Sequence, residues 1–101
     1  MTTPNPATWQ TILEKRSQEL LRQVTGLQKT VLADGALSVK TKTLMMMLCD
    51  ALLAHSEGVA NIAKRARALG ASEAEITETV AVAFLMGGLP SLVTGTNAFR
   101  D

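Results

Sequence analysis

The side chains of this sequence that could do acid–base or thiol chemistry lie close together, between residues 49 and 57. Cys49, Asp50, His55 and Glu57 supply one thiol, two carboxylates and the only imidazole of the chain. Because histidine changes its charge near neutral pH, His55 can serve as a general base or contact a ligand, with Asp50 or Glu57 orienting its ring. Alternatively, His55 is a polar residue at a helix junction that satisfies a free backbone group.

Cys49 and Asp50 have different expected roles. Cys49 lies six residues before His55, which places the two side chains on different faces of a continuous helix. We therefore expect no cysteine–histidine nucleophile pair, and we expect Cys49 to be a small core residue. Asp50 is the one charge within the apolar run Leu44 to Leu53. It either reaches a polar pocket or interface, where it contacts a ligand, or faces water at a gap in the helical bundle.

Other ligand-binding signatures are missing from the sequence. The chain has one histidine and one cysteine, and they do not belong to a cluster of metal-ligating residues, so we expect no metal site and no cofactor. Gly87 and Gly88 do not have the spacing of a phosphate-binding loop. They favour a tight turn and a close approach of helices.

Hydrophobic spacing predicts an all-α protein of about five to six helices, since no alternating strand pattern occurs. The N-terminal helical region covers about 8–33, and we expect two helices or one bent helix there because Thr25 and Gly26 weaken the run. Ser38 is the natural cap of the next helix. From Leu44 to Ala54 nearly every side of that helix is apolar, which is typical of an element surrounded by neighbours.

The later helices have boundaries marked by residues with known helix-terminus chemistry. These are a candidate cap at Ser56, a left-handed residue at Gly70, a capping box at Ser72 and Glu75, and a break at Gly87, Gly88 and Pro90. A short last helix is expected after the break.

Length and composition limit the class of protein. A chain of 101 residues predicts one domain, and 47% apolar with 3% aromatic residues predicts closely packed aliphatic helices. The formal net charge is +1 and the basic residues are scattered, so we expect no nucleic-acid partner. The run Leu44 to Leu53 is shorter than the ~20 residues of a membrane span. With no secretory signal pattern and one cysteine, we expect a cytoplasmic protein that does not bind a membrane.

Residues 35–93 carry motifs that are individually common but ordered in a specific way. They are Leu37, Ser38, Lys40, Lys42, the run GASEAEI at 70–76, Glu78, Gly87, Gly88 and Pro90. Together they resemble the carboxymuconolactone decarboxylase family, which includes the alkylhydroperoxidase D branch. The resemblance implies a single domain over 1–101 with its family core at about 36–99. It also implies an all-helical bundle completed by homo-oligomerisation into a trimer or hexamer, which fits a thin core with apolar surface left to bury.

The resemblance also implies where the reactive residues of the family would lie. Glutamate would stand at Thr43, the two cysteines of a CxxC pair at His55 and Gly58, and a histidine at Ile62. The lactone-decarboxylating branch has its histidine at the same Ile62 position. Glycine and isoleucine can neither attack a substrate nor move a proton. We therefore expect neither thiol peroxidase nor lactone decarboxylase activity.

Two functions follow from these residues. The first is a non-redox, homo-oligomeric member of the family that binds a small molecule or serves as an interaction protein. The second is an enzyme with altered acid/base chemistry, in which His55 is the base and Glu57 or Asp50 orients it. The expected partners are further copies of the chain and a small-molecule ligand.

Overall fold

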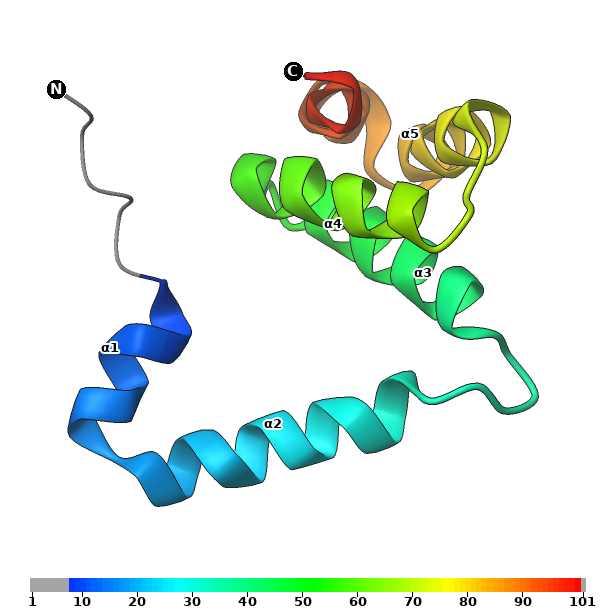
Figure 1. Cartoon of the computed structure of the whole chain (residues 1–101). Helices are drawn as coiled ribbons and strands as arrows, with labels where there is room; N and C mark the ends of the chain where they lie inside the picture. The colour runs from blue at the N-terminus through cyan, green and yellow to red at the C-terminus, as the bar shows by residue number, and fades with distance from the viewer. Residues whose placement is uncertain (1–7, 101) are drawn as a thin grey trace, which may run out of the picture. The chain divides into compact units, whose positions relative to one another are not determined.

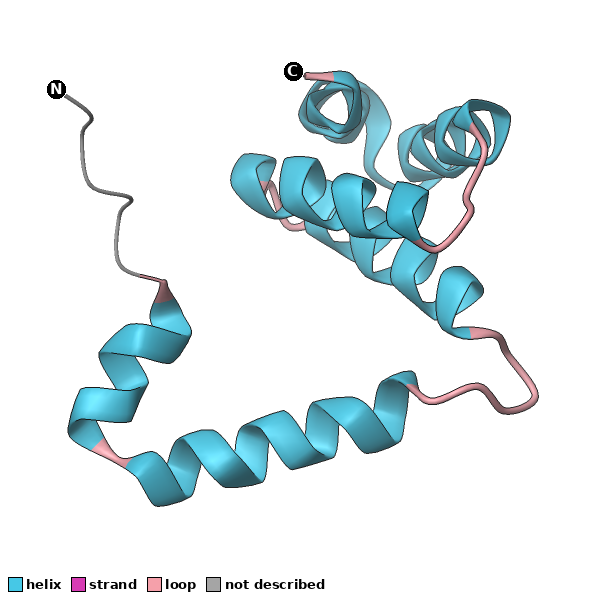
Figure 2. Ribbon diagram, viewed as in Figure 1, coloured by secondary structure: helices cyan, strands magenta, loops and turns pink. Residues whose placement is uncertain are grey.

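The computed structural model describes residues 8–100, and every regular element in that range is helical (Figure 1). Figure 2 shows helices and loops and no strand in the described part of the chain. The elements are α1 (Trp9–Arg16), α2 (Gln18–Leu32), α3 (Val39–Leu52), α4 (Ser56–Ala68), α5 (Glu73–Gly95) and the short 3-10 helix η1 (Thr96–Phe99). The predicted all-α fold is confirmed.

The helices belong to two compact units. α1 and α2 lie in the first unit, which ends at Ala33, and the other helices lie in the second, which begins at Asp34. Neither α1 nor α2 contains a buried residue, whereas the second unit has a continuous apolar core. The predicted family core of about 36–99 therefore falls in the second unit.

Two helices precede Gly35, as predicted, but the break between them lies at Ser17 and not at Thr25 and Gly26, where the helical run was expected to weaken. α2 continues through both residues. Ser17 has an extended backbone, and its hydroxyl accepts a hydrogen bond from the Leu20 amide at 3.1 Å. A side-chain cap satisfies a free amide of the first turn, so it sets a helix start more strongly than one interior glycine opposes a helix.

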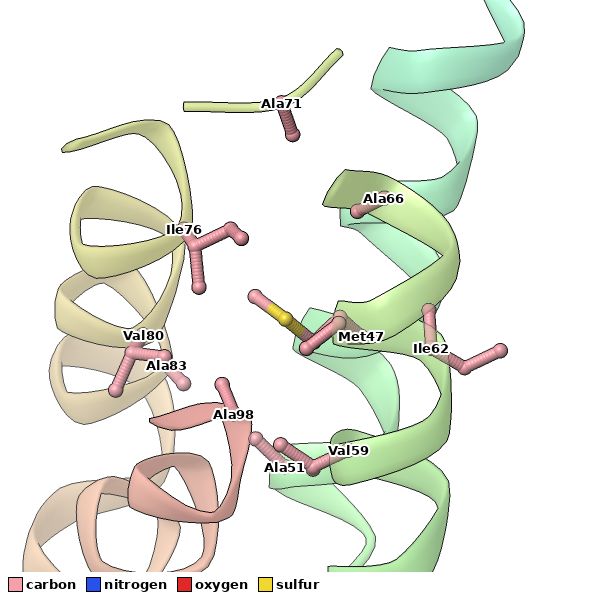
Figure 3. Close-up of a cluster of buried hydrophobic side chains, with 11 residues drawn as sticks. Met47, Ala51, Val59, Ile62, Ala66, Ala71, Ile76, Val80, Ala83 and Ala98 are labelled. Atoms are coloured by element: carbon pink, nitrogen blue, oxygen red, sulfur yellow. The ribbon is translucent and has the colours of Figure 1, made fainter. Parts of the chain in front are cut away.

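Small side chains fill the core of the second unit, where α3, α4, α5 and η1 meet. Six of the eleven core residues are alanine, which lets the helices approach closely. Figure 3 shows most of these side chains converging on Met47, whereas Ile62 points away from α5. The core consists of Met47, Ala51, Val59, Ile62, Ala63, Ala66, Ala71, Ile76, Val80, Ala83 and Ala98.

α3 is buried along one face only. Its buried residues are Thr43, Met47 and Ala51, which are spaced by four and share a side of the helix. Met45 is 48% exposed, and Cys49 is also exposed. Within the chain α3 is therefore not surrounded, and the prediction that Cys49 is a core residue was wrong because it lies off the buried face.

The turn between α4 and α5 has the predicted end signals. Gly70 has a φ of 96°, and the Ala71 amide bonds back to the Ala66 carbonyl at 2.9 Å, a pattern that closes a helix with a left-handed residue. Ser72 and Glu75 then form the capping box: the Ser72 hydroxyl accepts from the Glu75 amide, and Glu75 accepts from the Ser72 amide. The predicted helix boundary is confirmed.

α5 is interrupted where Gly87, Gly88 and Pro90 predicted a break. Gly88 has a φ of 75° and a ψ of −165°, which is not helical. The chain folds back after the kink, because a Cβ placed on Gly95 would lie 2.8 Å from a methyl carbon of Val80. The close approach of the two halves thus requires a residue without a side chain at position 95.

The sequence analysis considered only Leu44 to Leu53 as a membrane span, but the longer apolar segment of the described chain is α5 with η1. By length and composition alone, Glu73–Phe99 could cross a membrane. Its buried positions face the core of the second unit, and the kink at Gly88 interrupts it. Several apolar residues near the kink and at the end of α3 are exposed, and we group them under the name apolar face: Leu52, Leu53, Leu85, Met86, Leu89 and Val93.

Candidate functional site

His55 lies in the turn that joins α3 to α4. The turn repeats the backbone pattern found after α4: the His55 amide donates to the Asp50 carbonyl at 2.8 Å, and the Ala54 amide lies 3.4 Å from the Ala51 carbonyl. The left-handed residue of this turn is Ala54, with a φ of 63°. This conformation folds His55 back over the last turn of α3, where Asp50 lies.

The side chains of His55 and Asp50 also meet. His55 Nδ1 lies 3.1 Å from Asp50 Oδ1, and because an ionised carboxylate can only accept, Nδ1 donates. In the neutral ring this places the proton on Nδ1 and leaves a lone pair on Nε2. The His55 side chain is 59% exposed and that of Asp50 is 24% exposed. The pair is thus a partly buried carboxylate that orients an accessible imidazole.

The first turn of α4 faces the other oxygen of Asp50. A Cβ placed on Gly58 would lie 2.5 Å from Asp50 Oδ2, so the carboxylate packs directly against the backbone of Gly58. Gly58 is the third residue of α4. A negative charge is stabilised near a helix N-terminus, where amide groups are free and the helix dipole is positive. The predicted cap, Ser56, is instead the first helical residue, and His55 occupies the cap position without a capping side-chain bond.

Glu57 does not pair with His55. Its Oε1 accepts a hydrogen bond from Arg100 Nη2 at 2.8 Å, and Arg100 also donates to the Asn97 side chain at 3.2 Å. This contact ties the C-terminal end of η1 to the start of α4, beside the buried Ala98. Of the two carboxylates considered from the sequence, Asp50 is therefore the one that orients the histidine.

Two further positions that the resemblance marks as reactive are part of the packed interior. Thr43 is fully buried, and its hydroxyl donates to the Val39 carbonyl one turn earlier at 2.7 Å. Ile62 is 9% exposed and belongs to the core. Neither side chain offers a group that can transfer a proton to a ligand.

No group of three or more histidine, cysteine, aspartate or glutamate side chains in residues 8–100 is arranged to hold a metal ion. The contacts described above define a candidate site of Asp50, His55 and Gly58. Cys49 precedes Asp50 and is exposed on α3.

Sequence reasoning missed two residues that shape this region. Ala54 adopts a left-handed conformation that alanine seldom takes, and no local signal announces it. Arg100 meets Glu57 across 43 residues of sequence. The one available signal was the spacing of Asp50 and His55 around a predicted helix end, because a chain that turns back after a helix can bring such residues together.

Comparisons with known proteins give two matches. Residues 18–101 match the family model described as the carboxymuconolactone decarboxylase family. Among solved structures, the chain is similar to the crystal structure of a carboxymuconolactone decarboxylase family protein from Legionella pneumophila in its apo form. The two are 30% identical with a TM-score of 0.81, over 86% of this chain and 78% of the other. No curated protein matched.

Proposed function

This chain belongs to the carboxymuconolactone decarboxylase family, and from that premise we propose that it is a non-redox member that binds a small molecule at the His55–Asp50 pair. The observation that carries the proposal is the hydrogen bond between His55 Nδ1 and Asp50 Oδ1. It lies where the resemblance would place the first thiol of the family, and it creates an oriented imidazole there.

The chemistry of the pair indicates the kind of ligand. With a neutral ring the pair carries one negative charge, so it favours a neutral hydrogen-bond donor over an anion. Nε2 accepts from such a donor because Nδ1 is held by Asp50. Leu52 and Leu53 lie just before His55 in the sequence and are exposed. They favour a ligand whose donor group is attached to an apolar body, such as a phenol.

The apolar face supports a homo-oligomer. Leu85 and Met86 are 78% and 77% exposed, and Leu52 contacts the same kink, since a Cβ on Gly87 would lie 2.9 Å from a Leu52 methyl carbon. Exposed apolar side chains gathered at one place in the fold are typical of a protein–protein interface. We propose that further copies of the chain cover it, in the trimer or hexamer that the resemblance implies.

A second candidate function is general acid/base catalysis. The same hydrogen bond favours it, because a carboxylate that fixes Nδ1 leaves Nε2 as a base toward a substrate. In this alternative His55 is the catalytic residue and Asp50 orients it. Only the catalytic function predicts that a substrate is turned over, so the same variants of His55 and Asp50 distinguish the two functions.

The test of binding uses phenol as the probe and the His55 ring as the reporter. The chain has one histidine, so the imidazole nitrogen signals in an NMR spectrum belong to a single residue. We expect phenol to shift the Nε2 signal saturably, benzoate to shift it less, and Asp50→Asn to weaken the response. Glu57→Gln is the matched control, which keeps the wild-type response because Glu57 bonds Arg100. Equal shifts with phenol and benzoate, or none, contradict the binding proposal.

The test of catalysis uses p-nitrophenyl acetate as an activated ester. Catalysis predicts hydrolysis over many turnovers that His55→Ala abolishes and Asp50→Asn reduces, while both variants remain folded. Hydrolysis that is the same in wild type and His55→Ala excludes the catalytic alternative.

The test of assembly measures mass in solution. Leu85→Glu places a charge on the apolar face, and we expect light scattering to report a monomer in place of the oligomer. Ala74→Glu is the control, since Ala74 is exposed in the first turn of α5, away from that face. A wild-type protein that is already monomeric contradicts this part of the proposal.

A further inference from the structure

Gly58 stands in α4 without a backbone reason for being glycine. Its φ is not in the left-handed region, and α4 is regular through it. Glycine inside a helix is destabilising relative to alanine because it loses more conformational freedom on folding. What distinguishes the position is its neighbour: a Cβ there would lie 2.5 Å from Asp50 Oδ2 and 2.7 Å from Asp50 Cγ. The carboxylate occupies the space that a side chain would fill.

We propose that Gly58 is the positioning residue of the His55–Asp50 pair, an inference that rests on the proposed function for its meaning at the site. The missing side chain lets the Asp50 carboxylate lie against the first turn of α4. In that place Oδ2 faces the helix backbone and Oδ1 holds His55 Nδ1 at 3.1 Å. Gly58 touches no ligand itself and acts through Asp50.

The geometry makes two arrangements of the site exclusive. A side chain at position 58, including the cysteine that the resemblance would place there, needs the volume that the Asp50 carboxylate now occupies. We expect Asp50 to make room by rotating its short side chain, because a Cβ at position 58 would lie within 3.1 Å of Cγ and both carboxylate oxygens, and this rotation moves Oδ1 away from His55. The site therefore contains either a side chain at position 58 or the oriented imidazole.

The experiment is Gly58→Ala, read through the ring nitrogen signals of His55. In wild type we expect the signals of a ring whose Nδ1 carries the proton donated to Asp50. In Gly58→Ala we expect both ring nitrogen signals to move to the values found in Asp50→Ala, where no carboxylate is present. Gly26→Ala is the matched control, because Gly26 lies inside α2 with nothing within 4 Å of an added Cβ. It leaves the His55 signals at their wild-type values.

A double-mutant cycle supplies an independent measurement. Alanine favours the helix, so Gly58→Ala by itself raises the melting temperature unless it displaces a contact. We expect a larger rise when the substitution is made in the Asp50→Ala background than in wild type, because no carboxylate is then displaced. Equal rises in the two backgrounds, or wild-type ring signals in Gly58→Ala, overturn the proposal.

Both readouts are obtained without a ligand. Failure of phenol to bind would contradict the proposed function and leave the role of Gly58 standing, whereas an unchanged His55 ring in Gly58→Ala would contradict the role of Gly58 alone.

Discussion

The turns that end α3 and α4 have the same backbone pattern and opposite uses. After α4, the left-handed residue is Gly70 and the next residue, Ala71, is 8% exposed and belongs to the core. After α3, the left-handed residue is Ala54 and the next residue, His55, is exposed and hydrogen-bonded to Asp50. The turn after α4 contributes a residue to the core, whereas the turn after α3 places a polar pair where solvent reaches it.

The left-handed residue is alanine in one turn and glycine in the other, and this difference indicates that the turn after α3 is the less stable of the two. Glycine adopts a positive φ without steric cost, whereas an L-residue such as alanine in that region is disfavoured by about 1–2 kcal/mol. Residues held in unfavourable backbone conformations cluster at functional sites. The strained Ala54 next to an oriented histidine, compared with the relaxed Gly70 next to a buried alanine, supports the assignment of the site to the end of α3.

The largest effect is expected when a carboxylate, such as the turn after α3 contains, is placed in the turn after α4. Ala71→Asp buries a carboxylate that has no partner, and we expect the free energy of unfolding to fall by about 3 kcal/mol. Urea denaturation measures it. The control is Ala68→Asp, three residues earlier and exposed, where a loss of about 1 kcal/mol or less is expected. Similar losses in both variants would show that position 71 is no more buried than position 68.

Exchanging the left-handed residues should change stability in opposite directions. Gly70→Ala places a Cβ at a φ of 96°, and we expect a loss of about 1–2 kcal/mol. Ala54→Gly relieves the strain at 63°, and we expect a gain of about 0.5–1 kcal/mol. Thermal unfolding of the two single variants checks both signs. A loss of stability in Ala54→Gly contradicts the interpretation of Ala54 as strained.

The turn after α4 should be weakened by acid. Arg67 Nε and Nη2 donate to Glu73 at 2.7 and 2.9 Å, and these hydrogen bonds hold the pKa of Glu73 below its usual range. Because the folded-state pKa is lower than that of the unfolded chain, the contribution to stability is complete above the unfolded value. It is lost as the pH falls from about 5 through the folded value.

Glu73→Gln isolates that contribution. We expect wild type to be more stable than the variant at neutral pH and the difference to shrink steadily on acidification, as urea denaturation at several pH values would measure. The contribution is small because the Glu73 side chain is exposed. A difference that grows as the pH falls contradicts the sign of the pKa shift.

The smallest effect is expected at Cys49. The residue is exposed on α3 and lies off its buried face, so Cys49→Ser should change the free energy of unfolding by no more than about 0.5 kcal/mol. Hydrogen peroxide consumption by wild type and by the variant should equal that of buffer. Cysteine-dependent peroxide consumption would contradict the non-redox proposal.

Local chemistry made most of the fold predictable. Gly70, the capping box of Ser72 and Glu75, and the break at Gly88 are confirmed, because each depends on residues within a few positions of one another. Family membership was predicted from the order of such local motifs and is confirmed by the match over residues 18–101. The start of α2 was placed wrongly because the cap at Ser17 was not recognised.

The candidate site could be predicted only in part. His55 and Asp50 were identified by residue type, but either Asp50 or Glu57 could have oriented the histidine. That choice depends on Arg100, which engages Glu57 from the far end of the second unit, and on Gly58, which receives the Asp50 carboxylate. Neither contact has a local signature, since the two residues of each contact do not lie on one helix.

By itself the sequence determined the helices, most of their ends and the absence of the family's thiols, because backbone preferences and residue identities are properties of short segments. Only the tertiary structure decided that Cys49 is exposed, that Ala54 is left-handed and that Asp50 pairs with His55. The physical reason is that the covered face of a helix and the partner of a charge are set by neighbouring helices, whose positions no single segment encodes.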